Sequence, residues 1–211
     1  MLAKETAPTV YIVDDDAEVL KAIARLVASA NLNVAAFSSA QSFLAAFDPA
    51  APACLVLDLA MPGASGLELQ RTLEARARGL PIVFLTGHGD IGSSVQAMKR
   101  GASDFLTKPV DEEVLMEAVR AALERRRERE HEDAERGRIE QRIATLTARE
   151  RQVLEGIVAG LLNKQIAGNL LTAEKTVKFH RANLMRKMDV TTVASLVKAA
   201  ERGGIGKTPG H

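Results

Sequence analysis

The sequence predicts an α/β domain followed by a smaller, all-helical domain. Two observations favour this division. In the first 110 residues, five short apolar runs alternate with stretches of helical periodicity, a pattern typical of βαβ units and a parallel sheet. From Thr147 onward the pattern is helical throughout. A chain of 211 residues is long enough for two small domains.

Each element of the first domain follows from its local pattern. The strands are expected near 9–14, 33–37, 53–58, 81–86 and 103–107, and the helices near 17–31, 39–48, 65–78 and 91–101. Ile23, Leu26 and Val27, for example, give the first helix an apolar stripe. Because crossovers between parallel strands are right-handed, we expect helices on both faces of the sheet.

A long charged helix should connect the two domains. Residues 111–145 begin with an apolar stripe that includes Leu115 and Val119, and the stretch that follows is almost entirely charged. Opposite charges three or four residues apart support a solvated helix, and Gly137 is a candidate break. We therefore expect an α/β domain over residues 1–124, a helical linker over 125–144 and a second domain over 145–211.

Four short helices should build the second domain. They are expected near 147–160, 163–170, 173–188 and 191–202. Thr147 and Glu150 have the spacing of a capping box, which places the first helix start at Thr147. The pair of helices from Asn163 to Met188 has the pattern of a helix–turn–helix, with one basic face on its second helix. A basic helix of this kind fits the major groove of DNA.

Composition and charge limit the classes of function. Residues 1–124 hold 10 basic and 16 acidic residues, whereas residues 145–211 hold 11 basic and 5 acidic ones. The second domain is therefore the candidate for nucleic acid. No apolar run is long enough to cross a membrane, and a single cysteine, Cys54, excludes an internal disulfide. We expect a cytoplasmic protein without a membrane partner.

Polar residues follow four of the predicted strands and should converge at one edge of the sheet. Asp14 and Asp15 follow the first strand, Asp58 ends the third, Thr86 ends the fourth and Lys108 follows the fifth. Such strand ends are where α/β sheets bind ligands. The carboxylates suit Mg²⁺, and the hydroxyl and ammonium groups suit a phosphoryl group that Asp58 could accept.

The first domain resembles the receiver domain of two-component response regulators, a flavodoxin-like and CheY-like fold with strand order 2-1-3-4-5. The segments that carry the likeness are VYIVDDD, LVLDLAMPGASGLEL, IVFLTGHGD and GASDFLTKP. The resemblance implies that Asp58 accepts phosphate from a sensor histidine kinase. It assigns Mg²⁺ to Asp14, Asp15, Asp58 and the backbone carbonyl of Ala60, the phosphoryl group and its switch to Thr86, Phe105 and Lys108, and modulation of hydrolysis to His88.

The second domain resembles the LuxR/FixJ family of DNA-binding domains through LTARERQVLEGIVAG, NKQIA and EKTVKFHRANLMRKM. The likeness implies a homodimer upon phosphorylation, with the final helix as a dimerising element, duplex DNA as a partner and RNA polymerase as a further candidate. The implied DNA contacts are Lys164, Lys175, Lys178, Phe179, His180, Arg181 and Lys187. The turn departs from the family, since Ala173 cannot cap the second helix and Asp189 replaces a usual glycine at its end.

Three functions remain to be separated. The leading one is a phosphorylation-switched transcription regulator, which is not an enzyme acting on a small-molecule substrate. A magnesium-dependent phosphohydrolase of the haloacid dehalogenase type is the alternative, but it needs an acid where this chain has Ala60. A receiver acting only as a protein-interaction module is the third, and the basic second domain argues against it.

Overall fold

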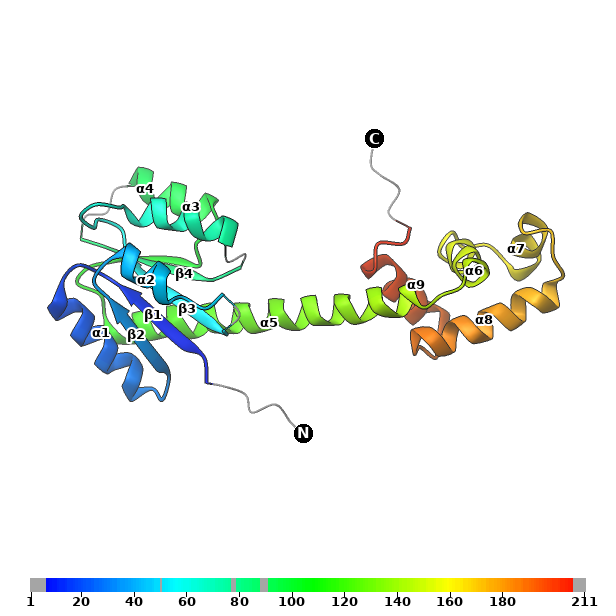
Figure 1. The fold of residues 1–211 in the computed structure, drawn as a ribbon, viewed down its shortest axis with the longest axis horizontal. Coiled ribbons are helices and arrows are strands. Elements are labelled where there is room, and N and C mark those ends of the chain that lie inside the picture. The colour runs from blue at the N-terminus through cyan, green and yellow to red at the C-terminus, as the bar shows by residue number, and fades with distance from the viewer. Residues whose placement is uncertain (1–6, 50, 77–78, 88–90, 207–211) are drawn as a thin grey trace. The chain divides into compact units, whose positions relative to one another are not determined.

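The structure is a computed structural model that describes residues 7–49, 51–76, 79–87 and 91–206 (Figure 1). The chain divides into two compact units, an N-terminal unit over Met1–Glu130 and a C-terminal unit over His131–His211. Each unit has its own hydrophobic core, as the two sequence patterns predict.

The N-terminal unit is a doubly wound parallel sheet, as predicted. Its five strands lie in the order β2-β1-β3-β4-β5, and all four neighbouring pairs are parallel. The strands are β1 (Thr9–Val13), β2 (Asn33–Phe37), β3 (Ala53–Asp58), β4 (Ile82–Thr86) and β5 (Asp104–Thr107). The helices are α1 (Ala17–Ser29), α2 (Ala40–Ala46), α3 (Gly66–Arg76), α4 (Ile91–Lys99) and the first part of α5 (Glu112–Ala144).

Two apolar layers cover the two faces of this sheet. Tyr11 and Val13 point into a layer shared with α2, α3 and α4, whereas Val10 and Ile12 point into a layer shared with α1 and α5. This alternation follows from the two-residue period of a strand. A sheet buried on both faces needs nearly continuous apolar strands, and all six residues of β3 are buried.

The C-terminal unit is helical. The second part of α5 packs with α6 (Ala148–Val158), α7 (Asn163–Asn169), α8 (Glu174–Met188) and α9 (Val193–Arg202) around one core. Ile139 and Ile143 of α5, in the segment that the charge pattern assigns to a linker, are buried in this core. The expected break at Gly137 was wrong, because α5 continues through it without interruption.

The turns that bound α8 adopt strained backbone conformations at residues that carry side chains. Leu171 and Asp189 have φ values of 51° and 55°, in the left-handed region where glycine is usual. Ala173 precedes α8 without a side-chain cap, as its methyl group requires. The guanidinium of Arg142 donates to the Asp189 carboxylate over 2.7 Å and to the carbonyl of Met188 over 3.1 Å. These bonds support the helix end, where the resemblance led us to expect glycine.

Helices suited to a bilayer are missing from the described part of the chain, where none is both long and apolar enough to span one.

Candidate functional site

Four strand ends bring the predicted polar residues together at the carboxyl edge of the sheet. Asp14 follows β1 directly, and Asp58 and Thr86 are the last residues of β3 and β4. Lys108 follows β5 directly. The register pairs Asp58 with Leu85 and Thr86 with Thr107, so these ends lie at nearly the same level. The site is therefore a product of parallel pairing between segments far apart in the sequence.

Lys108 links the two buried carboxylates of the site. Its Nζ lies 2.6 Å from Asp14 Oδ2 and 3.0 Å from Asp58 Oδ1. Asp14 is 1% exposed and Asp58 is 4% exposed, while Asp15 is exposed to solvent. The ammonium group compensates part of the negative charge that the sheet edge concentrates.

The pKa values of Asp58 and Lys108 are both raised above their ordinary values. Burial raises the pKa of the Asp58 carboxyl above its ordinary value of 3.8, and the attraction of Lys108 opposes this only in part. Burial by itself would lower the pKa of Lys108, but its hydrogen bonds to Asp14 and Asp58 outweigh burial and raise that pKa above 10.5. The lysine thus keeps its charge where an incoming anion would meet it.

Three carboxylates of the site have the arrangement that a cation requires. Asp14, Asp15 and Asp58 each offer an oxygen, and these oxygens lie within 4.8 Å of one another. Mg²⁺ is bound through carboxylate oxygens and retains water, so this donor set fits it. Asp16, the third acid of the run that begins at Asp14, is engaged elsewhere, because its carboxylate caps α1 by accepting from the amides of Glu18 and Val19.

The remaining predicted residues of this edge have distinct surroundings. Thr86 is buried, and its carbonyl accepts from the Lys108 amide over 2.7 Å. Phe105 is half-buried, with its ring centroid 6.1 Å from that of Phe84. Ala60 is exposed beside Asp58. His88, the expected modulator of hydrolysis, lies outside the described residues.

Sequence reasoning missed the role of Gly66, the first residue of α3. A Cβ at this position would lie 2.5 Å from the backbone oxygen of Asp58 and 3.1 Å from Leu59 Cα. The amide of Gly66 also donates to the carbonyl of Leu59 over 2.9 Å. Helix α3 can therefore approach the end of β3 only because residue 66 lacks a side chain.

In the C-terminal unit, α8 carries an exposed face with positive charge. Lys175, Lys178 and Phe179 are exposed, and their spacing of three and four residues places them on one side of the helix. Lys178 pairs with Glu174 over 3.1 Å, a contact on the helix surface. Lys164 is exposed on α7, and His180 is half-buried with its ring 5.8 Å from that of Phe179.

Two of the expected DNA contacts are engaged within the unit. Arg181 donates to Asn163 Oδ1 over 3.0 Å and so joins α8 to the start of α7. Lys187 lies 2.7 Å from the carboxylate of Glu150, which is 4% exposed. These partners lie 18 and 37 residues away in the sequence, so no local pattern could reveal them.

Comparisons with known proteins agree with both halves of this description. The family described as "Response regulator receiver domain" matches residues 10–120, and that described as "Bacterial regulatory proteins, luxR family" matches residues 144–200. The chain is 44% identical to the response regulator protein TodT of Pseudomonas putida over 94% of this chain and 87% of that protein.

Two further relatives extend over nearly the full length. The transcriptional regulatory protein FixJ of Azorhizobium caulinodans is 44% identical over 93% of each chain. The solved structure of the response regulator StyR is 46% identical, with a TM-score of 0.81 over 93% of this chain and all of that one. The chain therefore belongs to the family of two-component response regulators that join a receiver domain to a LuxR-type DNA-binding domain.

Proposed function

We propose that Asp58 accepts a phosphoryl group from a sensor histidine kinase and that this event switches binding of the C-terminal unit to DNA. The observation that carries the proposal is the pairing of a buried Asp58 carboxylate with Lys108 at 3.0 Å, next to two further acids. Phosphorylation of Asp58 would add negative charge next to the positive charge of Lys108. The expected output is regulated transcription rather than turnover of a substrate.

The chemistry follows from the residues at the sheet edge. A carboxylate oxygen of Asp58 attacks phosphorus, a P–O bond forms, and the bond from phosphorus to the kinase histidine breaks. Lys108 compensates charge on the transferred phosphoryl oxygens. Asp14, Asp15, Asp58 and the carbonyl of Ala60 would hold Mg²⁺, which lowers the repulsion between carboxylate and phosphate. His88 is proposed to influence the later hydrolysis.

Switching requires a second arrangement that the new charge favours. Thr86 would turn toward the phosphoryl group and Phe105 would move inward behind it, which alters the surface of α4 and β5. Val95 and Met98 of α4 are 45% and 47% exposed, an apolar pair suited to a second copy of the chain. A phosphorylation-dependent homodimer, with α9 as a further dimerising element, would present two copies of α8 to duplex DNA.

The proposed acceptor is tested by phosphorylation of matched variants. Intact-mass measurement after incubation with acetyl phosphate and Mg²⁺ should show one added phosphoryl group on the wild type and none on Asp58→Asn. Asp16→Asn is the control, because asparagine caps a helix as well as aspartate and leaves the site intact. Phosphate retained by Asp58→Asn, or lost from Asp16→Asn, would contradict the assignment.

The proposed output is tested on DNA. Operator sites are mapped across a genome with the wild type and with Asp58→Asn, each with and without the phosphoryl donor. The donor should increase site occupancy for the wild type alone. Equal occupancy under all four conditions would show that DNA binding does not depend on phosphorylation and would contradict the proposal.

A further inference from the structure

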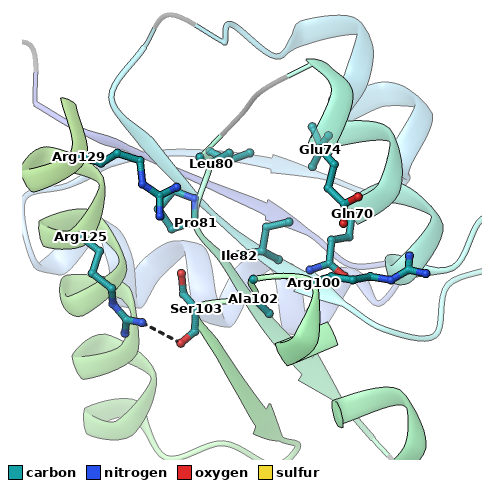
Figure 2. Close-up of a pocket in the computed structure, with 13 residues that line it drawn as sticks. Gln70, Glu74, Leu80, Pro81, Ile82, Arg100, Ala102, Ser103, Arg125 and Arg129 are labelled. Atoms are coloured by element: carbon teal, nitrogen blue, oxygen red, sulfur yellow. Dashed lines mark hydrogen bonds between the residues drawn. The ribbon is translucent and has the colours of Figure 1, made fainter. Parts of the chain in front are cut away.

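A cavity of the N-terminal unit lies at the opposite edge of the sheet from Asp58. It has a volume of about 240 Å³ and is located where β4 and β5 begin. One wall is formed by the end of α3 and the turn after α4, and the other by α5 (Figure 2). A small metabolite fits such a space.

The charge of the lining is positive. Arg100, Arg125 and Arg129 border the cavity, whereas Glu74 is the only carboxylate among its described lining residues. Figure 2 shows Arg125 and Arg129 extending from α5 toward the starts of the strands. Arg125 is held in place by the carbonyls of Ser103 at 3.2 Å and Ala121 at 3.3 Å. Within the described part of the chain, no carboxylate pairs with any of the three guanidinium groups.

A second observation, separate from the positive charge, is that two buried polar atoms of the lining have no hydrogen-bond partner. Gln70 is 2% exposed, and its Nε2 donates to the carbonyl of Ala97 over 3.2 Å, but its Oε1 accepts nothing. The Nη1 of Arg100 is buried and donates to nothing. Unsatisfied buried polar atoms are rare because they destabilise a fold, so each calls for a missing partner. Gln70 and Arg100 both border the cavity, so a molecule bound there is a candidate for the missing partner.

The loop before β4 has room for a guanidinium group because residue 79 is glycine. Gly79 has a φ of 91°, and a Cβ there would lie 2.8 Å from Arg129 Nη1 and 3.4 Å from Arg126 Nη1. Two guanidinium groups therefore lie at this loop, that of Arg126, which is paired with Glu130 over 2.6 Å, and that of Arg129. The absence of a side chain at residue 79 thus lets Arg129 lie against the loop at the mouth of the cavity.

We propose that this cavity binds a small ligand that carries an oxyanion, a phosphate or a carboxylate, together with a hydrogen-bond donor. Guanidinium groups bind such oxyanions with two parallel hydrogen bonds, and Oε1 of Gln70 accepts from the donor. The proposal does not depend on phosphorylation of Asp58, because the two sites lie at opposite ends of the strands. It assigns a ligand site to a part of the receiver fold that the phosphoryl chemistry does not use.

The test uses two probes, inorganic phosphate and succinate, on the full chain without Mg²⁺ and at constant ionic strength. Amide NMR signals of Gly101 and Ser103, which border the cavity, report binding. At neutral pH, phosphate carries an oxyanion and a hydroxyl donor, whereas succinate carries oxyanions alone. Both should shift the two signals to saturation, and phosphate should bind more tightly.

Three variants complete the test. Arg125→Ala/Arg129→Ala should weaken both probes by at least about tenfold, since hydrogen bonds to charged groups are strong. Arg127→Ala is the matched control, because this exposed arginine lies on the same helix but does not border the cavity. Gln70→Leu should weaken phosphate and leave succinate unchanged, and retained succinate binding also shows that the variant is folded.

Several outcomes would overturn the proposal. The signals of Gly101 and Ser103 could fail to saturate with either probe, which would indicate that water alone fills the cavity. The arginine double variant could bind as tightly as the wild type, or Arg127→Ala could lose as much affinity. Equal losses of phosphate and succinate in a folded Gln70→Leu would remove the donor requirement.

Discussion

Lys187 of α8 lies 2.7 Å from Oε2 of Glu150, and that same oxygen accepts from the amide of Thr147 over 2.8 Å. One buried carboxylate therefore closes the capping box of α6 and also joins α6 to the end of α8. Lys187 donates to the carbonyl of Thr145 as well, over 3.1 Å. The lysine is thus part of the fold of the DNA-binding unit.

Removal of this carboxylate should destabilise the C-terminal unit. Glu150→Ala loses the reciprocal cap and leaves the Lys187 ammonium without its carboxylate partner, a combined cost of about 2 kcal/mol. Chemical denaturation followed by circular dichroism measures the change. Glu155→Gln, on the exposed side of the same helix, should change the free energy of unfolding by less than about 0.5 kcal/mol. Equal effects of the two variants would contradict the role of Glu150.

The same carboxylate predicts a pH dependence of stability. Burial acts to raise the pKa of Glu150, but hydrogen bonds from Lys187 and Thr147 outweigh it, and the pKa falls below its ordinary value of 4.5. The ionised Glu150 carboxylate therefore stabilises the fold above pH 4.5. This contribution is lost as the pH falls through the folded-state pKa and the carboxylate is protonated. The difference in unfolding free energy between wild type and Glu150→Gln should therefore be largest near neutral pH and shrink below pH 4.5. A difference that grows on acidification would contradict this sign.

Two glycine-to-alanine changes should have opposite effects. Gly66→Ala places a methyl group 2.5 Å from the backbone oxygen of Asp58, so α3 must shift and stability falls by about 1–3 kcal/mol. Phosphorylation of Asp58 should slow in this variant. Gly137→Ala meets no atom within 4 Å and should stabilise α5 by about 0.5–1 kcal/mol. Thermal unfolding of both variants tests the pair, and a shift of the same sign would refute the account.

The exposed face of α8 should bind DNA through charge. Lys178→Ala should weaken duplex binding, and the slope of log affinity against log salt should fall by about 1 if the lysine contacts a phosphate. Arg181→Ala should weaken binding too, but also lose the bond to Asn163 that joins α8 to α7. Arg151→Ala is the control, an exposed arginine of α6. An unchanged affinity for a folded Lys178→Ala would exclude this lysine from the interface.

The apolar pair on α4 should govern the phosphorylated dimer. Val95→Ala/Met98→Ala removes two exposed apolar side chains of this helix and should raise the dissociation constant of the phosphorylated dimer at least about tenfold. Sedimentation with and without the phosphoryl donor measures it. Leu162→Ala, an exposed apolar residue of the C-terminal unit, should have no such effect. Persistence of the dimer in the double variant would place the contact elsewhere.

The acidic edge of the sheet could be predicted because it depends on strand ends alone. Asp58 ends an apolar run that is typical of a buried strand. Parallel pairing then brings the ends of such strands to one edge of the sheet. The interruption expected at Gly137 failed for a physical reason. A single glycine costs a helix only about 1 kcal/mol, and the buried Ile139 and Ile143 nearby outweigh that cost.

Contacts over long sequence separations could not be predicted. The pattern on α8 shows Lys187 and Arg181 as basic residues, and nothing local indicates that Glu150 and Asn163 engage them. Whether either also contacts DNA stays a prediction. The cavity around Gln70 could not be predicted for the same reason, because its lining comes from α3, α5, the turn after α4 and the segments that lead into β4 and β5, which are scattered along the chain.

The burial of Ile139 and Ile143 has a practical consequence for dissection of the protein. The luxR family match begins at residue 144, so a fragment cut at that match would lack both side chains. A Cβ at Gly203 would clash with Ile143 Cδ1, which shows how tightly the end of α9 is packed against this isoleucine. A minimal DNA-binding fragment should therefore start near His131, and one that starts at residue 144 would expose an unfilled groove along α9.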